Sequence, residues 1–110
     1  MNWIPLTSED QLSTISSLST ERPQVIFKHS TRCSISSMAL SRLERSEPSD
    51  KVDFYYLDLI KYRTISAEIA EKYQVAHESP QILLIKNGNC TYEESHMGIN
   101  MDEILEQAVK

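Results

Sequence analysis

The chain has 110 residues, which is the length of one domain and enough to bury a hydrophobic core without help from a metal or a disulfide. Its 11 basic and 16 acidic residues give a net charge of −5, so no basic stripe is available for the phosphates of a nucleic acid. Apolar runs are short, as at Ile82 to Ile85, and none reaches the length that crosses a bilayer. We therefore expect a single domain over residues 1–110, with neither a nucleic-acid nor a membrane partner.

The N-terminus predicts a cytoplasmic location. Met1 to Pro5 has no basic flank followed by an apolar stretch, which is the pattern of a signal peptide. In a reducing compartment, the two cysteines, Cys33 and Cys90, are expected to be free thiols rather than a structural bridge.

The first predicted helix follows a short initial strand, expected at Trp3 to Leu6. Ser8 and Gln11 stand at the spacing of a capping box, which places the start of the helix at Ser8. Apolar residues then recur every three positions, as one face of a helix requires: Leu12, Ile15 and Leu18.

A buried strand and a second helix come next. Pro23 to His29 is rich in β-branched and aromatic residues, which favours a strand. A short loop, Ser30 to Arg32, leads to a helix that ends before Pro48 in a polar stretch. The apolar positions of this helix are Ile35, Met38, Ala39, Leu40 and Leu43.

The middle of the chain predicts another strand and another helix. Val52 to Leu59 is aromatic at its centre and is expected to be a strand. Thr64 is a plausible N-cap for the helix that follows. Helical spacing relates four residues of that segment: Tyr62, Ile65, Ile69 and Tyr73.

A hairpin is the clearest local signal. After a loop from Gln74 to Pro80, the strand Gln81 to Lys86 meets Asn87-Gly88, a dipeptide typical of a two-residue hairpin turn. The partner strand is expected over Asn89 to Glu94.

The last predicted helix begins at Asn100, after a break at Gly98. Asn100 is the expected N-cap with Glu103 at the third position, and Ile99 against Ile104 would form a hydrophobic staple. The expected buried stripe comprises Met101, Ile104, Leu105, Ala108 and Val109.

This order of elements defines a fold class. Strands joined by crossover helices pair in parallel, and a terminal hairpin makes the sheet mixed. A strand, a cysteine at the start of a helix and a loop that ends in proline before a hairpin form the thioredoxin arrangement. We therefore predict a thioredoxin-like α/β fold with a central mixed sheet of four to five strands and about four flanking helices.

Cys33 is the predicted catalytic residue. It stands where a strand gives way to a helix, and the free N–H groups and partial positive charge of a helix N-terminus favour a thiolate. Arg32 adds a neighbouring cation, and the Ser36 hydroxyl, one turn on, could donate to the sulfur.

Cys33 to Ser36 form a C-x-x-S pattern, in which an oxygen replaces the second sulfur of a dithiol motif. Because oxygen cannot close an internal disulfide, the pattern suits a one-cysteine cycle in which a small thiol regenerates the enzyme. The alternative is a small buried hydrophobe, as free cysteines commonly are.

Ser79-Pro80 is the second predicted part of the site. In a thioredoxin-like fold the loop before the hairpin packs against the active cysteine, and we predict that Pro80 is cis. Ser79 would then offer its N–H and C=O to an extended substrate backbone, as an added strand does.

The segments Lys28 to Ser36 and His77 to Gln81 resemble those of the monothiol bacilliredoxin family, which are YtxJ-like thioredoxin-fold proteins. The likeness covers nearly the whole chain, although the family usually has Pro where this chain has Ser34. It implies a monothiol oxidoreductase that reduces mixed disulfides between client proteins and bacillithiol, a low-molecular-weight thiol. That thiol would be a co-substrate rather than a bound cofactor, and a second thiol molecule or a reductase would clear Cys33. His77 and Gln81 would line the same groove as Ser79 and Pro80.

Two other functions stay open: a non-catalytic thioredoxin-like binding or adaptor module, for which Ser34 is the best hint, and a thiol-based redox sensor. The three histidines are too scattered for a zinc site, and no signature of a Cys–His hydrolase is present. Cys90 is interpreted as a packed or half-exposed strand thiol, too far from Cys33 for a disulfide.

Overall fold

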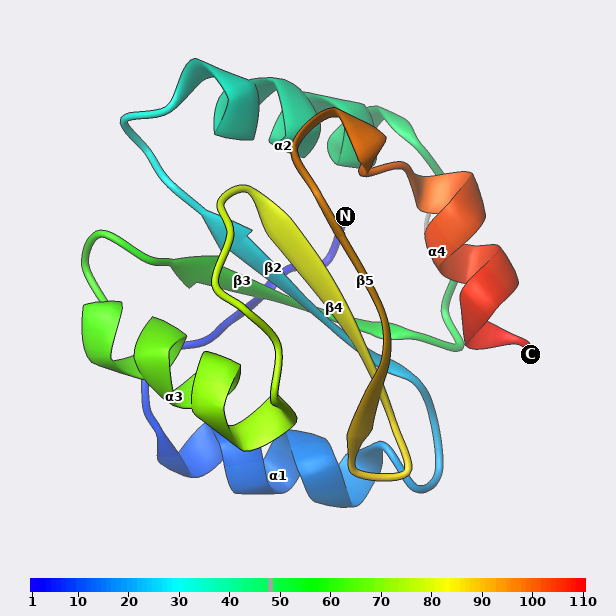
Figure 1. Ribbon diagram of the computed structural model, residues 1–110. Helices are drawn as coiled ribbons and strands as arrows, with labels where there is room; N and C mark the ends of the chain where they lie inside the picture. The colour runs from blue at the N-terminus through cyan, green and yellow to red at the C-terminus, as the bar shows by residue number, and fades with distance from the viewer. Residues whose placement is uncertain (48) are drawn as a thin grey trace.

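A five-stranded mixed sheet forms the centre of the computed structural model, which describes residues 1–47 and 49–110 (Figure 1). The strand order is β1-β3-β2-β4-β5; β1 and β2 each pair with β3 in parallel, whereas β4 runs antiparallel to β2 and β5. This is the predicted thioredoxin-like fold. The strands are β1 (Ile4–Pro5), β2 (Gln24–His29), β3 (Asp53–Asp58), β4 (Gln81–Lys86) and β5 (Asn89–Ser95).

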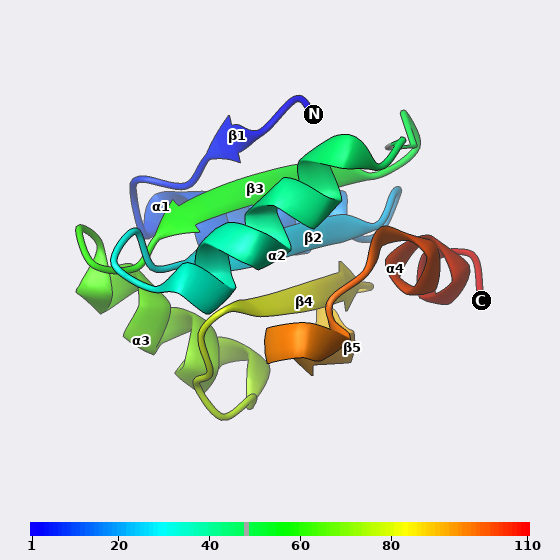
Figure 2. The ribbon, with the colours of Figure 1, turned by 90° about the horizontal axis from the view of Figure 1, so that it is seen from above.

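Helices cover both faces of the sheet, as Figures 1 and 2 show. One apolar cluster joins α2 and α4 to the sheet, and a second joins α1 and α3 to the opposite face. The helices are α1 (Asp10–Leu18), α2 (Ser34–Arg45), α3 (Arg63–Tyr73) and α4 (Met101–Ala108), with a single 3₁₀ turn, η1 (His96–Gly98), before α4. No helix of the described residues is both long and apolar enough to span a bilayer.

The central strands are buried on both faces, which explains their composition. All six residues of β2 are buried; its centre, Val25 to Phe27, is apolar at three successive positions, and the polar residues Gln24, Lys28 and His29 stand at its ends. Val25 and Phe27 face the α2–α4 side, whereas Ile26 faces the α1–α3 side. Lys28 follows Ile26 by two residues and therefore also faces the α1–α3 side.

The hairpin turn between β4 and β5 confirms the prediction made for Asn87-Gly88. The φ angles are 52° at Asn87 and 79° at Gly88, as a two-residue turn of this type requires. Ser19, just after α1, holds the turn in place: its C=O accepts from the Asn87 N–H at 2.9 Å and its hydroxyl accepts from the Gly88 N–H at 2.8 Å.

The predicted helix caps have mixed outcomes. The Asn100 side chain caps α4 by accepting from the Glu103 N–H at 2.8 Å, as expected. The Ser8 prediction is wrong, because α1 begins after Glu9 and only the Gln11 side chain reaches back, to the Ser8 N–H at 3.0 Å. The Thr64 prediction is also wrong, because Tyr62 occupies the N-cap position of α3.

Two further details concern the helix ends. Val109 was expected in the buried stripe of α4, but the helix ends at Ala108 and Val109 is 84% exposed. Helix α2 ends at Arg45, ahead of Pro48, as expected; Pro48 itself lies outside the described residues.

Candidate functional site

The pairing of β2 with β4 brings the two predicted parts of the site to one edge of the sheet. Lys28, near the end of β2, lies opposite Gln81, the first residue of β4. The loop that leaves β2 and the loop that enters β4 therefore meet at the same edge. Figures 1 and 2 both show the N-terminal end of α2 beside the start of β4.

Cys33 occupies the N-cap position of α2, with an extended backbone at φ −111° and ψ 123°. Its C=O accepts the first helical hydrogen bond, from the Ser37 N–H at 3.1 Å, and its own N–H donates to Ser30 at 3.2 Å. The residue is a free thiol and is partly exposed. The sulfur therefore stands at the mouth of the helix, where solvent reaches it.

The pKa of Cys33 is held below its ordinary value. The largest cause is a hydrogen bond from the Ser36 backbone N–H, followed in the same direction by the Ile35 N–H and the Ser36 hydroxyl, and desolvation opposes them. Ser36 is fully buried, and its hydroxyl also accepts from the Ser30 N–H at 3.3 Å, which fixes its position. Arg32, the other residue expected to stabilise the thiolate, is exposed and is not among these causes.

The Ser79–Pro80 peptide bond is cis, as predicted. The C=O of Pro80 accepts from the His96 N–H at 3.0 Å, which ties the loop to η1. Within the described residues, the N–H and C=O of Ser79 take no part in any backbone hydrogen bond. They are therefore free to pair with an extended chain.

Gln81 does not line the groove where we expected it. It is fully buried, and its side-chain amide donates to the C=O of Ala76 at 3.1 Å and to the Glu93 carboxylate at 3.1 Å. Its carbonyl oxygen accepts from the Glu78 N–H at 3.3 Å. Gln81 thus shapes the loop from inside instead of meeting a ligand.

His77 points toward α3 rather than along the groove. Its Nδ1 lies 3.2 Å from the Lys28 ammonium and 3.3 Å from the Ser66 hydroxyl. Burial lowers the pKa of His77, and the Lys28 charge lowers it further. Only Glu78 separates His77 from Ser79 in the chain, and the Nδ1 of His77 is turned to Lys28 and Ser66.

Two buried ionisable residues beside the site have no functional role predicted from the sequence, and His29 is interpreted there as a structural residue at a strand end. Lys28 is fully buried on the α1–α3 side, and burial lowers its pKa from 10.5 to about 8. His29 is 4% exposed on the α2 side, against Phe27 and Tyr56, and its Nδ1 has no hydrogen-bond partner in the described chain. The available signal in the sequence is a Lys-His pair that directly follows three apolar strand residues, Val25 to Phe27.

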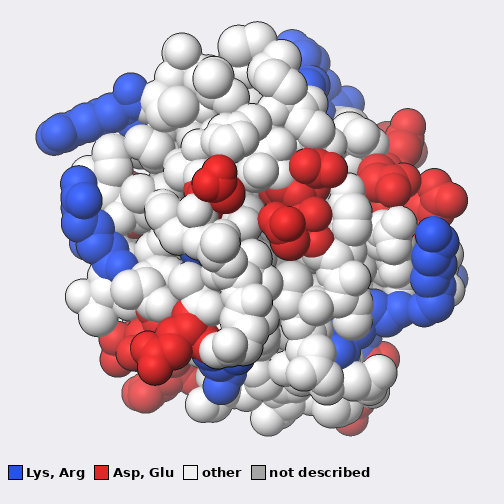
Figure 3. All heavy atoms as spheres, in the orientation of Figure 1, with Lys and Arg blue, Asp and Glu red and all other residues white. Residues whose placement is uncertain are grey.

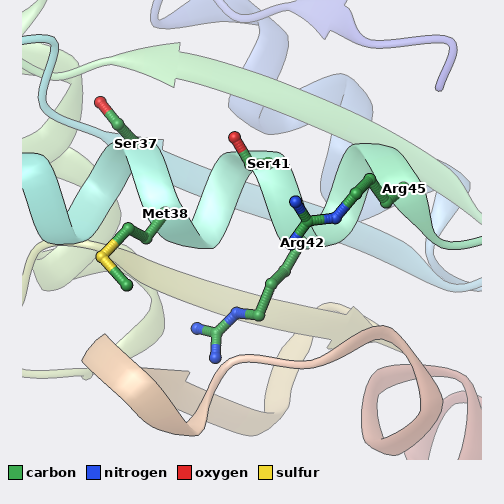
Figure 4. A pocket seen from close by; sticks show the side chains of 5 residues that line it. All are labelled: Ser37, Met38, Ser41, Arg42 and Arg45. Atoms are coloured by element: carbon green, nitrogen blue, oxygen red, sulfur yellow. The ribbon is translucent and has the colours of Figure 1, made fainter.

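The outer face of α2 adjoins the thiol and carries both apolar and basic groups. Ile35 and Met38 are 39% and 53% exposed. A shallow hollow of about 400 Å³ lies along this face, where Figure 4 shows Arg42 and Arg45 pointing in different directions. Arg42 donates to the C=O of Met97 at 3.4 Å and so links α2 to η1.

Cys90 lies away from this edge. It pairs with Ile85, four residues along β4 from Gln81, which is a displacement of about 13 Å at the usual rise of a strand. Its side chain packs against the α1–α3 cluster, and burial raises its pKa. A Cys33–Cys90 disulfide, for which the Cα atoms must lie within about 7 Å, is not compatible with this placement.

The fold and the thiol at the start of α2 define a thioredoxin-fold protein of the oxidoreductase class. A family described as monothiol bacilliredoxin BrxC matches residues 4–104, and the chain belongs to that family. This confirms the resemblance drawn from the sequence.

Solved structures support the same assignment. One is described as a candidate oxidoreductase with a thioredoxin fold; it is 33% identical, with a TM-score of 0.78, and the match covers 97% of this chain and 93% of that one. Thioredoxin from Malassezia sympodialis is 21% identical, with a TM-score of 0.68 and coverage of 96% and 85%. Spinach chloroplast thioredoxin f is 17% identical, with a TM-score of 0.68 and coverage of 96% and 88%. The two thioredoxins show the fold alone.

Proposed function

We propose that the protein is a monothiol thiol-disulfide oxidoreductase that reduces mixed disulfides between client proteins and a low-molecular-weight thiol of the bacillithiol type. The observation that carries the proposal is the partly exposed Cys33 thiol, whose pKa is lowered by the N–H groups at the start of α2. A lowered pKa raises the thiolate fraction near neutral pH, and the thiolate is the nucleophile in disulfide exchange.

The reaction takes two exchanges. The Cys33 thiolate attacks the small-thiol sulfur of the mixed disulfide, so the new bond joins Cys33 to the small thiol and the client leaves as a thiolate that takes up a proton. A second small-thiol molecule, as its thiolate, then attacks the small-thiol sulfur on Cys33. This step releases a small-thiol disulfide and restores the Cys33 thiolate. In the net reaction the mixed disulfide and one free small thiol give the reduced client thiol and one small-thiol disulfide, which a separate reductase would recycle.

The remaining site residues have positioning roles in this proposal. The N–H and hydroxyl of Ser36 hold the negative sulfur, and Arg32 supplies a nearby positive charge in solvent. The free N–H and C=O of Ser79 pair with the client backbone next to its disulfide, while Pro80 shapes the loop. The reducing cytoplasm is the proposed setting, since it keeps a lone thiol reduced.

The test uses a client protein that carries one bacillithiol or glutathione on a single cysteine. The wild-type protein should release the small thiol with turnover, and mass spectrometry should detect the adduct on Cys33. Cys33→Ser should abolish both, whereas the matched control Cys90→Ser should keep them. Release at the wild-type rate by Cys33→Ser would remove the proposal.

The same experiment separates the two other functions. A stable Cys33 adduct without turnover would indicate a redox sensor. A Cys33 pKa equal to that of a free cysteine, with no adduct, would indicate a binding module, for which the exposed Ile35 and Met38 would offer apolar contact area.

A further inference from the structure

Lys28 is a buried cation that has no anionic partner among the residues that the structure describes. Its side chain is fully buried, and within the described residues its Nζ forms two hydrogen bonds, with the C=O of Ser66 at 3.4 Å and with the His77 Nδ1 at 3.2 Å. No salt bridge of the described residues includes it. The acid nearest in sequence to His77 is Glu78, whose carboxylate lies 3.9 Å from His96. Buried charges are ordinarily paired, so an unneutralised lysine points to an anion that arrives with a ligand.

A surface cavity opens beside this lysine. It has a volume of about 240 Å³, and two of its lining residues, Ser66 and His77, are the same two that contact the Lys28 ammonium. The lining contains no acid; it is composed of Leu59, Arg63, Ser66, Ala67 and His77. Arg63, the first residue of α3, brings a guanidinium, which binds carboxylates in a bidentate manner.

The contacts of His77 determine which of its nitrogens can donate. The Lys28 ammonium is only a donor, so the Nδ1 beside it accepts. The proton of the neutral imidazole then resides on Nε2, the nitrogen that Lys28 does not occupy. Burial and the Lys28 charge both favour this neutral form by lowering the pKa of His77, and together they outweigh the opposing effect of the Glu78 carboxylate. The lining thus offers one guanidinium and one N–H donor beside the apolar side chains of Leu59 and Ala67.

The cavity lies at the same edge of the sheet as the thiol. Lys28 is one residue from the end of β2, Leu59 directly follows β3, and His77 precedes Ser79 by two residues. Figures 1 and 2 both show the start of α3 at the end of the sheet where the chain leaves β2 for α2. The cavity and the Cys33 thiol thus share one edge of the sheet, and a small ligand that uses both would carry its anionic group away from its sulfur, toward α3.

We propose that this cavity is an anion subsite, in which Arg63, Ser66 and His77 bind a carboxylate of the low-molecular-weight thiol while Lys28 supplies a buried countercharge. The inference rests on the proposed function for the identity of the ligand. It adds to that function a reason why a carboxylate-bearing small thiol is preferred over a neutral one.

Direct binding is tested without any thiol chemistry. Succinate is titrated into the wild-type protein while backbone amide resonances are followed by NMR, with neutral succinamide as the matched probe. Succinate should shift the resonances of residues that line the cavity, and succinamide should not.

Arg63→Gln should weaken succinate binding about tenfold or more, as expected for loss of a charge-assisted contact. The control Arg45→Gln, on the outer face of α2, should leave it unchanged. Equal responses to both probes would overturn the subsite.

A kinetic test then connects the subsite to Cys33. The client carries either glutathione or glutathione diethyl ester, which differ in their carboxylates. The wild-type protein should release the acid form about tenfold faster, and Arg63→Gln should lose that preference. Equal wild-type rates would overturn the subsite and leave the proposed function standing. No release of either thiol would overturn the proposed function, while the succinate titration would still decide the subsite.

Discussion

The buried Lys28 predicts an unusual dependence of stability on pH. The pKa of this lysine is 10.5 in an unfolded chain and about 8 in the folded protein, because burial penalises the ammonium. Between these two values the unfolded chain binds more protons, so this residue makes stability rise with pH from about 8 to about 10.5. Below pH 8 the full cost is present. A gap of about 2.5 pKa units corresponds to about 3 kcal/mol at pH 7.

Lys28→Met removes the charge and keeps an unbranched side chain that is one atom shorter. The variant loses the contacts of Nζ with Ser66 and His77, worth about 1 kcal/mol each. At pH 7 we therefore expect Lys28→Met to be more stable than wild type by about 1–3 kcal/mol. Between pH 7 and pH 9.5 the wild type should recover about 2 kcal/mol relative to the variant.

Urea unfolding of both proteins at pH 7 and pH 9.5 measures this effect. The difference between the two proteins cancels other titrations, such as those of Tyr55 and Tyr73, whose pKa values burial raises. A stability difference that does not change across this pH range would refute the reasoning, as would a variant less stable than wild type at pH 7. A stabilised variant that also binds succinate poorly would show that the charge is kept for binding at a cost in stability.

Two other variants test the site and the fold. Ser36→Ala should raise the pKa of Cys33, because the hydroxyl no longer donates to the sulfur. The pKa should still lie below the ordinary value, because the N–H groups of Ser36 and Ile35 remain. The pH dependence of alkylation by iodoacetamide measures this pKa, and an unchanged value would contradict the role of the hydroxyl. Asn100→Ala should lower the free energy of unfolding by about 1 kcal/mol, because α4 loses its N-cap, whereas Asn100→Asp should keep the cap and the stability. Chemical denaturation measures both variants, and equal losses of stability would contradict the role of Asn100 as the cap.

The features that sequence predicted correctly depend on local chemistry. Asn87-Gly88 makes a hairpin because both residues tolerate positive φ, and Asn100 caps α4 because its side chain reaches an N–H three residues on. The position of Cys33 also followed from a local pattern, a strand that gives way to a helix. Crossover helices between strands then fixed the parallel part of the sheet.

The features that sequence missed depend on distant partners. The environment of Lys28 comes from Ser66 and His77, which are 38 and 49 residues away in the chain. Gln81 was misplaced for a similar reason, since its amide is held by Glu93 across the hairpin. At Ser8 and Thr64, capping residues stand near a helix start without occupying it, because packing of the apolar face determines where each helix begins.

The separation of the two thiols has a practical consequence for work with this protein. The Cys33 sulfur is accessible to solvent and has a lowered pKa. The Cys90 sulfur is half-buried against the α1–α3 face of the sheet, and its pKa is raised. An electrophile in neutral buffer should therefore mark one position of the native chain. A fluorophore or cross-linker can be installed at the mouth of α2 without mutagenesis, and fluorescence changes would then report events at that end of the sheet.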